Sequence, residues 1–269
     1  MTPEEIARLV EFGEAEAYAD FYAATPADYA AQFGINVQRL GSGFVFTTAA
    51  FDIPLFNRVV GLGLDEPATE SMVDEAVAHF RQRGVKHFAF QQSPLARPTE
   101  LPAWLAARGL RVSDNWVKVI RGTEPPPAIR TDLRVEVVGP ERGDDYSEIA
   151  AVAFGMSLVI KPWLAPIMGR MNWRHYLAFD GDKPVGCGAL FVKENIGWLG
   201  IAGTLPAARG RGAQGAIMAR RIRDGIELGC QWLVTETGEE TPTAPNPSFH
   251  NMIRTGFKPA YLRPNYMLP

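Results

Sequence analysis

The sequence predicts an α/β protein made of two tandem, related domains, because the order helix, strand, helix, strand occurs twice. Met72–Gly84 has helical spacing and precedes the β-rich run VKHFAFQ, just as Ala216–Gly229 precedes CQWLVTE. Further on, WLAARGLRVSDNWVKVI parallels MIRTGFKPAYLRPNYML. The glycines predicted to end these helices are 145 residues apart (Gly84, Gly229) and 147 residues apart (Gly109, Gly256).

A proline-rich stretch separates the two halves. RGTEPPPAIRTDL contains three consecutive prolines and few large apolar residues, which favours an extended connector. We therefore assign residues 1–122 to the first domain, 123–132 to the linker and 133–269 to the second domain.

The composition is that of a soluble globular protein. Of 269 residues, 46% are hydrophobic and 21% charged, and the net charge of −3 gives no electrostatic reason to expect nucleic acid as a partner. The acidic N-terminal stretch resembles no signal peptide, and no apolar run is long enough to cross a membrane. Two cysteines form no disulfide framework, and the four histidines have no ligand spacing. We expect a cytoplasmic protein that binds neither membrane nor metal.

The most informative segment is a strand, a loop and a helix in the second half. Ile196–Thr204 reads as a buried strand, Pro206 ends its pairing, and a helix begins near Gly212. That helix has an apolar stripe at three- and four-residue spacing. We expect the charged residues off the stripe to form a solvated face: Arg220, Arg221, Arg223, Asp224 and Glu227.

The loop itself, Arg209-Gly210-Arg211-Gly212-Ala213-Gln214-Gly215, has the composition of an anion site. Helix N-terminal N–H groups are unpaired and partly positive, and glycines allow backbone to approach phosphate closely. The two arginines add charge-assisted contacts. The corresponding first-half segment, LDEPATE (Leu64–Glu70), has three acids and no glycine or arginine, so we expect only the second half to bind phosphate.

One reading of the loop is a dinucleotide site. Gly210-x-Gly212-x-x-Gly215 matches that fingerprint, and Glu236 lies where a ribose-binding acid would. However, in the dinucleotide motif the glycines follow the strand directly, whereas here the residues LPAAR separate the strand from the glycines. The 33 residues after Glu236 are also too few for the remaining strands of a doubly wound sheet. Dinucleotide binding stays as a weaker alternative.

The same segment resembles the acyl-CoA motif of the GCN5-related N-acetyltransferases, Arg/Gln-x-x-Gly-x-Gly/Ala. Arg209 and Gly212 match its first two positions, whereas Gln214 departs at the third and Gly215 follows it. The flanking order of strand, loop, helix, strand and a helix ending in Gly-Phe is also that of the family. The resemblance covers residues 133–269 and implies tandem domains, each a mixed, mostly antiparallel sheet flanked by helices, of which the first is degenerate.

The resemblance implies where acetyl-CoA would bind. The strand before the loop would diverge from its neighbour and leave Ala202, Gly203, Thr204 and Leu205 to pair with pantetheine. The N–H groups of residues 210–215 would hold the pyrophosphate, with the Arg209 and Arg211 side chains beside it. Asn246 and Ser248, which have N-cap character, lie where relatives often contact pantetheine.

The chemistry requires a base for the attacking ammonium, whose reference pKa is about 10.4. Glu236, at the end of a strand, is our candidate; a solvent-facing acid is the equal alternative. Relatives often carry an acid, a tyrosine, four residues before the Gly-Phe pair, where this chain has Met252. Tyr261 and Tyr266 are weak candidates to replace it.

We therefore expect an acetyl-CoA-dependent N-acetyltransferase acting on a primary amine of a small molecule or peptide by direct attack in a ternary complex. A non-catalytic acyl-CoA-binding sensor is the alternative from another class, and the methionine at position 252 favours it. A homodimer is compatible with either function.

Overall fold

The computed structural model describes residues 1–269, which group into two compact units. Unit 1 comprises Met1–Lys118, Glu236–Ala244 and Pro259–Pro269, and unit 2 comprises Val119–Thr235 and Pro245–Lys258. The proline-rich stretch 123–132 belongs to unit 2.

The predicted repeat is present in the order of helices and strands. The first half contains α1 (Pro3–Ala23), α2 (Ala27–Phe33), β1 (Ile35–Leu40), β2 (Gly43–Thr48), β3 (Arg58–Val60), α3 (Glu70–Gln82), β4 (Ala89–Gln91), α4 (Leu101–Ala107) and β5 (Arg111–Arg121). After β6 (Arg134–Val138), the same order returns in α5 (Gly143–Ala153), α6 (Lys161–Leu164), β7 (Trp173–Asp180), β8 (Lys183–Lys193), β9 (Ile196–Thr204), α7 (Ala213–Glu227), β10 (Trp232–Gly238), α8 (Pro247–Arg254) and β11 (Lys258–Met267). The four glycines expected after the paired helices all have positive φ, between 73° and 90°.

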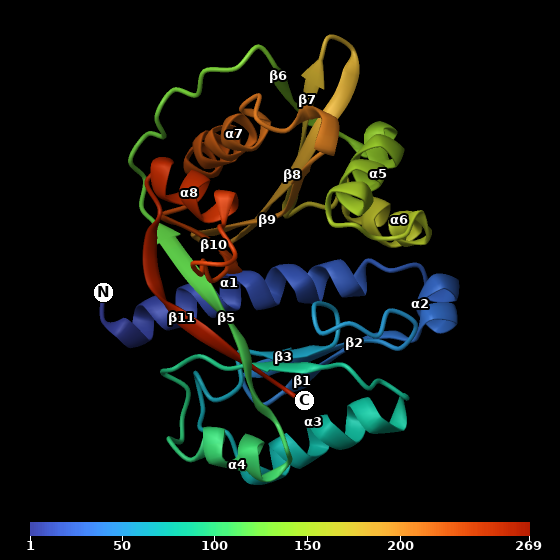
Figure 1. The fold of residues 1–269 in the computed structure, drawn as a ribbon, viewed down its shortest axis with the longest axis vertical. Helices are drawn as coiled ribbons and strands as arrows, with labels where there is room; N and C mark the ends of the chain where they lie inside the picture. The colour runs from blue at the N-terminus through green and yellow to red at the C-terminus, as the bar shows by residue number, and fades with distance from the viewer. The chain divides into compact units, whose positions relative to one another are not determined.

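Unit 1 contains the strand order β1-β2-β3-β4-β11-β5. From β1 to β11 the pairing is antiparallel except between β3 and β4, which are parallel. Helix α1 covers one face of these strands, and α3 and α4 cover the other (Figure 1). The last strand of the chain thus pairs with a strand of the first half, with Asn265 opposite Gln91. No local pattern in the sequence predicts this pairing.

Unit 2 contains the strand order β10-β9-β8-β7-β6, antiparallel except for β9 and β10. Helices α5 and α6 lie on one side of β7–β9, and α7 lies on the other (Figure 1). The core between them is rich in aromatic and branched side chains, including Tyr146, Trp163, Tyr176, Trp198, Ile217 and Ile222.

The expectation of a fully solvated polar face on α7 is wrong at two positions. Arg221 is 1% exposed and Asp224 is 3% exposed. Arg174, Arg220 and the Tyr176 hydroxyl all bond to the buried Asp224 carboxylate and compensate for its burial. Arg223 and Glu227 are exposed, as expected, whereas Arg220 is only half-buried.

Candidate cofactor site and buried charge network

The Arg209–Gly215 loop joins β9 to α7 through two residues in the left-handed region. Gly210 has φ 79° and Gly212, the residue that precedes the helix, has φ 87°. No side chain caps this helix. The first backbone bond at its start runs from the Ala216 N–H to the Gly212 carbonyl, at 3.0 Å. The N–H groups of residues 210–215 therefore remain available to an anion.

The matching helix of the first half has no such opening. Its N-cap residue is Thr69, whose hydroxyl accepts the Met72 N–H at 3.3 Å. The preceding residues Asp65 and Glu66 are exposed. A capped helix start with acids beside it disfavours phosphate, which agrees with the difference between the halves that the sequence predicts.

The two arginines of the loop have different environments. Arg209 is exposed and its side chain makes no hydrogen bond or ion pair. Arg211 pairs with Asp132 and Asp180, each at 2.5 Å, and these acids raise the pKa of its guanidinium above the usual value. The Arg211 side chain, expected to contact phosphate, is thus engaged by two of the protein's own carboxylates. Arg209 is the cation of the loop that has no partner.

The proline-rich stretch also supports the loop, which the sequence did not suggest. The Thr131 hydroxyl donates a hydrogen bond of 2.7 Å to the Arg211 carbonyl. A Cβ atom on Gly212 would lie 3.0 Å from the Arg130 carbonyl and 3.2 Å from Thr131, so only glycine fits this position without displacing the support. A Cβ atom on Gly215 would lie 3.4 Å from the Ile129 side chain, an ordinary contact distance.

Three polar side chains expected at the cofactor contact the protein itself. The Gln214 amide donates to the Ser248 hydroxyl at 3.0 Å, and Asn251 donates to the Gln214 carbonyl oxygen. Asn246 accepts the Phe249 N–H at 3.1 Å and caps α8. The two bonds of Gln214 join the start of α7 to α8, and together the three bonds give each of these side chains a partner within the protein.

Strand β9 leaves its neighbour β10 as the resemblance implies. The two strands pair only from Ile196 to Trp198, whereas β9 stays paired with β8 as far as Thr204. The Leu205 N–H donates to the Val185 carbonyl at 2.9 Å. The half-buried residues Ala202–Leu205 therefore follow the divergence and carry one backbone edge that β10 does not use.

Glu236 lies in unit 1 and is buried, so the alternative of a solvent-facing acid is wrong. Its side chain is 6% exposed and pairs with Lys118 at 2.9 Å. Lys118 also pairs with Glu14 at 2.8 Å. Burial raises the pKa of Glu236, the Glu14 carboxylate raises it further, and Lys118 opposes both. A carboxylate with a raised pKa is better matched to accepting a proton near neutral pH.

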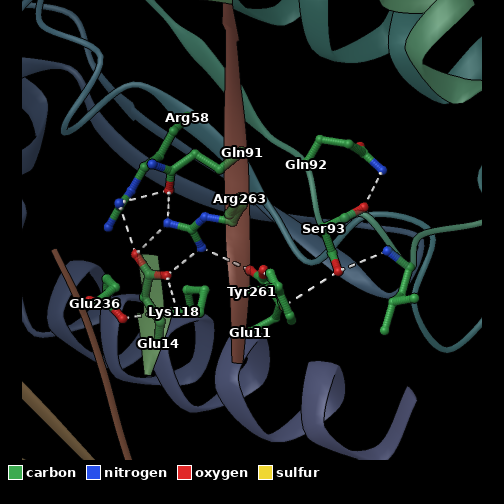
Figure 2. A network of polar contacts seen from close by, with 11 residues as sticks. Glu11, Glu14, Arg58, Gln91, Gln92, Ser93, Lys118, Glu236, Tyr261 and Arg263 are labelled. Atoms are coloured by element: carbon green, nitrogen blue, oxygen red, sulfur yellow. Dashed lines mark hydrogen bonds and ion pairs between the residues drawn. The ribbon is translucent and has the colours of Figure 1, made fainter. Parts of the chain in front are cut away.

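This pair belongs to a buried charge network, which Figure 2 shows beside helix α1. Its charged members come from α1, β3, β5, β10 and β11: Glu11, Glu14, Arg58, Lys118, Glu236 and Arg263. Three carboxylates thus balance three cations inside unit 1. Of these residues only Glu236 is predicted from the sequence, because the members of the network lie far apart along the chain and form no local pattern.

The two tyrosines considered as acids both lie on β11 in unit 1. The Tyr261 hydroxyl donates to Glu11 at 2.8 Å, and burial followed by this carboxylate holds its pKa well above the usual value (Figure 2). Tyr266 packs against the core beneath α3, and burial raises its pKa. On α8, Met252 is buried and cannot donate a proton.

No helix combines the length and apolar character that crossing a membrane requires. No group of three or more His, Cys, Asp or Glu side chains is placed to hold a metal ion.

Comparison with known proteins gives matches only at the level of structure. No protein-family model and no curated protein matches the sequence. A GCN5-related N-acetyltransferase from Kribbella flavida superposes with a TM-score of 0.65 at 15% identity, over 95% of this chain and 94% of that one. The chain has the GCN5-related N-acetyltransferase fold.

Two further structures support the assignment of this N-acetyltransferase fold. An N-acetyltransferase from Sphaerobacter thermophilus has a TM-score of 0.60 at 15% identity and covers 99% of this chain and 93% of that one. A tandem protein of the same fold from the clavulanic acid biosynthesis pathway has a TM-score of 0.56 at 16% identity, over 85% and 80% of the two chains. These matches confirm the predicted fold.

Proposed function

We propose that the protein is an acetyl-CoA-dependent N-acetyltransferase that acts on a primary amine of a small molecule or peptide. The Arg209–Gly215 loop carries this proposal. Its N–H groups from residue 210 to 215 have no acceptor at the open start of α7, and Arg209 has no partner. Phosphate groups such as those of CoA are the ligands that this combination binds.

In the proposed reaction the amine attacks the thioester directly in a ternary complex. The backbone edge of Ala202–Leu205 pairs with the pantetheine arm, and one of its N–H groups stabilises the oxyanion that develops on the carbonyl. Glu236 accepts the proton of the attacking ammonium. Burial raises the pKa of this carboxylate, and the Lys118 ammonium opposes that effect and favours the ionised form. The CoA thiolate leaves without a dedicated acid, because a thiol of pKa about 8.5 is a tolerable leaving group in water.

One observation favours a second candidate, a non-catalytic acyl-CoA sensor. Met252 occupies the α8 position at which relatives often have a tyrosine, and its buried side chain has no proton to give. A sensor would need the loop but neither Glu236 nor an acid.

Calorimetry with acetyl-CoA, CoA and NAD, followed by thiol-release assays with a panel of primary amines, tests these alternatives. Tight binding of acetyl-CoA with turnover of at least one amine supports the enzyme. Binding without turnover of any amine supports the sensor. Binding of NAD in place of CoA would reject both and restore the dinucleotide alternative.

A further inference from the structure

Arg221 is a buried arginine without a carboxylate partner. It lies on α7, two turns beyond the Arg209–Gly215 loop, and is 1% exposed. Asp224, the acid nearest to it on the helix, is committed to Arg174, Arg220 and the Tyr176 hydroxyl. Burial lowers the pKa of Arg221 to about 10, so it stays charged at neutral pH. A buried, unpaired charge is costly, and its contacts must account for its presence.

The guanidinium of Arg221 bonds to two strands at the same point. Its Nη1 donates to the Ala189 carbonyl of β8 at 2.9 Å and to the Gly200 carbonyl of β9 at 3.2 Å. Ala189 and Gly200 face each other immediately before the register between these strands shifts. The arginine therefore holds the sheet at the start of an irregularity.

That irregularity is a β-bulge centred on Ile201. This β-branched residue has φ 46°, a strained conformation that such side chains rarely adopt. From α5, the Tyr146 hydroxyl donates to the Ile201 carbonyl at 3.2 Å. Two successive carbonyls, those of Gly200 and Ile201, are thus held by side chains from two different helices.

Glycines allow both helices to come close to the bulge. A Cβ atom on Gly188 would lie 2.7 Å from Ile217 and 3.2 Å from the Arg221 guanidinium carbon. A Cβ atom on Gly203 would lie 2.3 Å from Ala153 of α5. Because the nearest distance is below 3 Å at each position, neither Gly188 nor Gly203 can be replaced by a larger residue unless the helices move. The bulge is consequently a tightly constrained part of unit 2, immediately before Ala202–Leu205.

We propose that Arg221 is a positioning residue for acyl transfer: by holding the Gly200 carbonyl it fixes the bulge that directs the Ala202–Leu205 backbone toward the acyl-pantetheine part of acetyl-CoA. This inference rests on the proposed function. Arg221 acts through the backbone and does not touch the substrate. Its loss should impair the recognition of the acyl-pantetheine part more than that of the nucleotide, since the Arg209–Gly215 loop does not depend on the bulge.

The variant Arg221→Met tests this inference because it keeps an unbranched apolar chain in place of the aliphatic part of arginine and removes the guanidinium with its charge and donors. We expect kcat/KM for acetyl-CoA to fall by about tenfold or more, as loss of charge-assisted hydrogen bonds implies. Affinity for 3′-phospho-ADP, the nucleotide part of CoA, should stay within about twofold of wild type. Arg221→Lys, which keeps the charge and can donate to a carbonyl, should recover part of the loss. Arg223→Met, an exposed arginine on the same helix, is the matched control and should change neither quantity.

Amide hydrogen exchange gives a readout that does not depend on activity. In Arg221→Met, exchange should become faster in the peptide containing residues 199–205 and stay unchanged at the start of α7. Equal weakening of acetyl-CoA and 3′-phospho-ADP binding, or unchanged exchange at the bulge with unchanged kcat/KM, would overturn the positioning role. Should Arg221→Met not fold, Tyr146→Phe removes the other bond to the bulge and must give the same selective loss. A wild-type protein that binds no acetyl-CoA would instead reject the proposed function.

Discussion

Glu14 is the residue on which the buried charge network depends most, and Glu14→Gln is the sharpest test of the fold of unit 1. Its carboxylate contacts Arg263 at 2.6 Å, Lys118 at 2.8 Å and Arg58 at 2.9 Å, and all four side chains are fully buried. Glutamine keeps the size and shape of the side chain and removes only its charge. The substitution therefore isolates the electrostatic role of Glu14.

The expected loss of stability follows from what Glu14→Gln leaves unpaired. Three cations would face only two carboxylates, and Arg58 would keep Gln91 but lose its only ion-pair partner. Removing one partner of a buried pair typically costs about 3–5 kcal/mol. At about 2–4 °C per kcal/mol for a chain of this size, the melting midpoint should fall by about 6 °C or more. Urea unfolding followed by tryptophan fluorescence measures the free energy of unfolding directly.

A matched control lies on the same helix. Glu16 pairs at 3.0 Å with Arg39, whose side chain is 61% exposed, so Glu16→Gln should change the free energy of unfolding by no more than about 1 kcal/mol. The cations lower the pKa of Glu14 in the folded state against the opposing effect of burial. Its stabilising contribution is therefore present above the unfolded value of 4.5 and is lost as the pH falls through the lower folded value. Glu14→Gln should lack this acid-side loss. If both variants were equally stable, or if their acid profiles coincided, the network would not have the role that its geometry indicates.

The remaining predictions concern the proposed reaction. Arg209→Ala should weaken acetyl-CoA binding, measured by calorimetry, by about tenfold or more. Arg211→Ala should mainly lower the melting temperature, because its guanidinium is paired with two acids of the protein. Stronger loss of binding in Arg211→Ala than in Arg209→Ala would contradict the assignment of Arg209 as the phosphate-binding cation. Glu236→Gln should reduce kcat at least about tenfold. The wild-type kcat should rise with pH and level off once the pH exceeds the raised pKa of Glu236. An unchanged kcat in Glu236→Gln would exclude Glu236 as the base. In thiol-release assays Met252→Leu should leave kcat within a few-fold of wild type. Tyr261→Phe should reduce stability without abolishing turnover, because the Tyr261 hydroxyl is bonded to Glu11. Complete loss of activity in a folded Tyr261→Phe variant would identify Tyr261 as the missing acid.

The sequence predicted most accurately the bounds of helices and strands that are set by residues close together along the chain. The strand Ile196–Thr204 has the predicted bounds, and α7 begins one residue after Gly212. Glycine, proline and hydrophobic spacing set these features within a few residues along the chain. The repeated order of elements was visible for the same reason, since each copy carries its own local signals.

The sequence could not predict contacts between distant segments. Arg221 seemed solvated because it lies off the apolar stripe of α7, yet it bonds to carbonyls on two strands. In the sequence, Glu14 is one of several acidic residues in the acidic N-terminal stretch. Its partners Arg58, Lys118 and Arg263 are 44 to 249 residues away along the chain. Buried charge is specified by three-dimensional pairing, which hydrophobic periodicity does not encode.

The two halves share an order of elements and differ in chemistry at one equivalent position, the residue before the helix that follows the third strand. In the first half this residue is Thr69, whose hydroxyl occupies a helix N–H, and in the second half it is Gly212, which leaves the N–H groups of α7 open. A threonine cap stabilises its helix by about 1 kcal/mol relative to an uncapped start. The second half forgoes that stability at Gly212, and the cost is small beside the affinity for phosphate that several unpaired N–H groups and Arg209 would give in the proposed site. An uncapped helix start in the second half and a capped one in the first is the difference that the proposed anion site, confined to one half, requires.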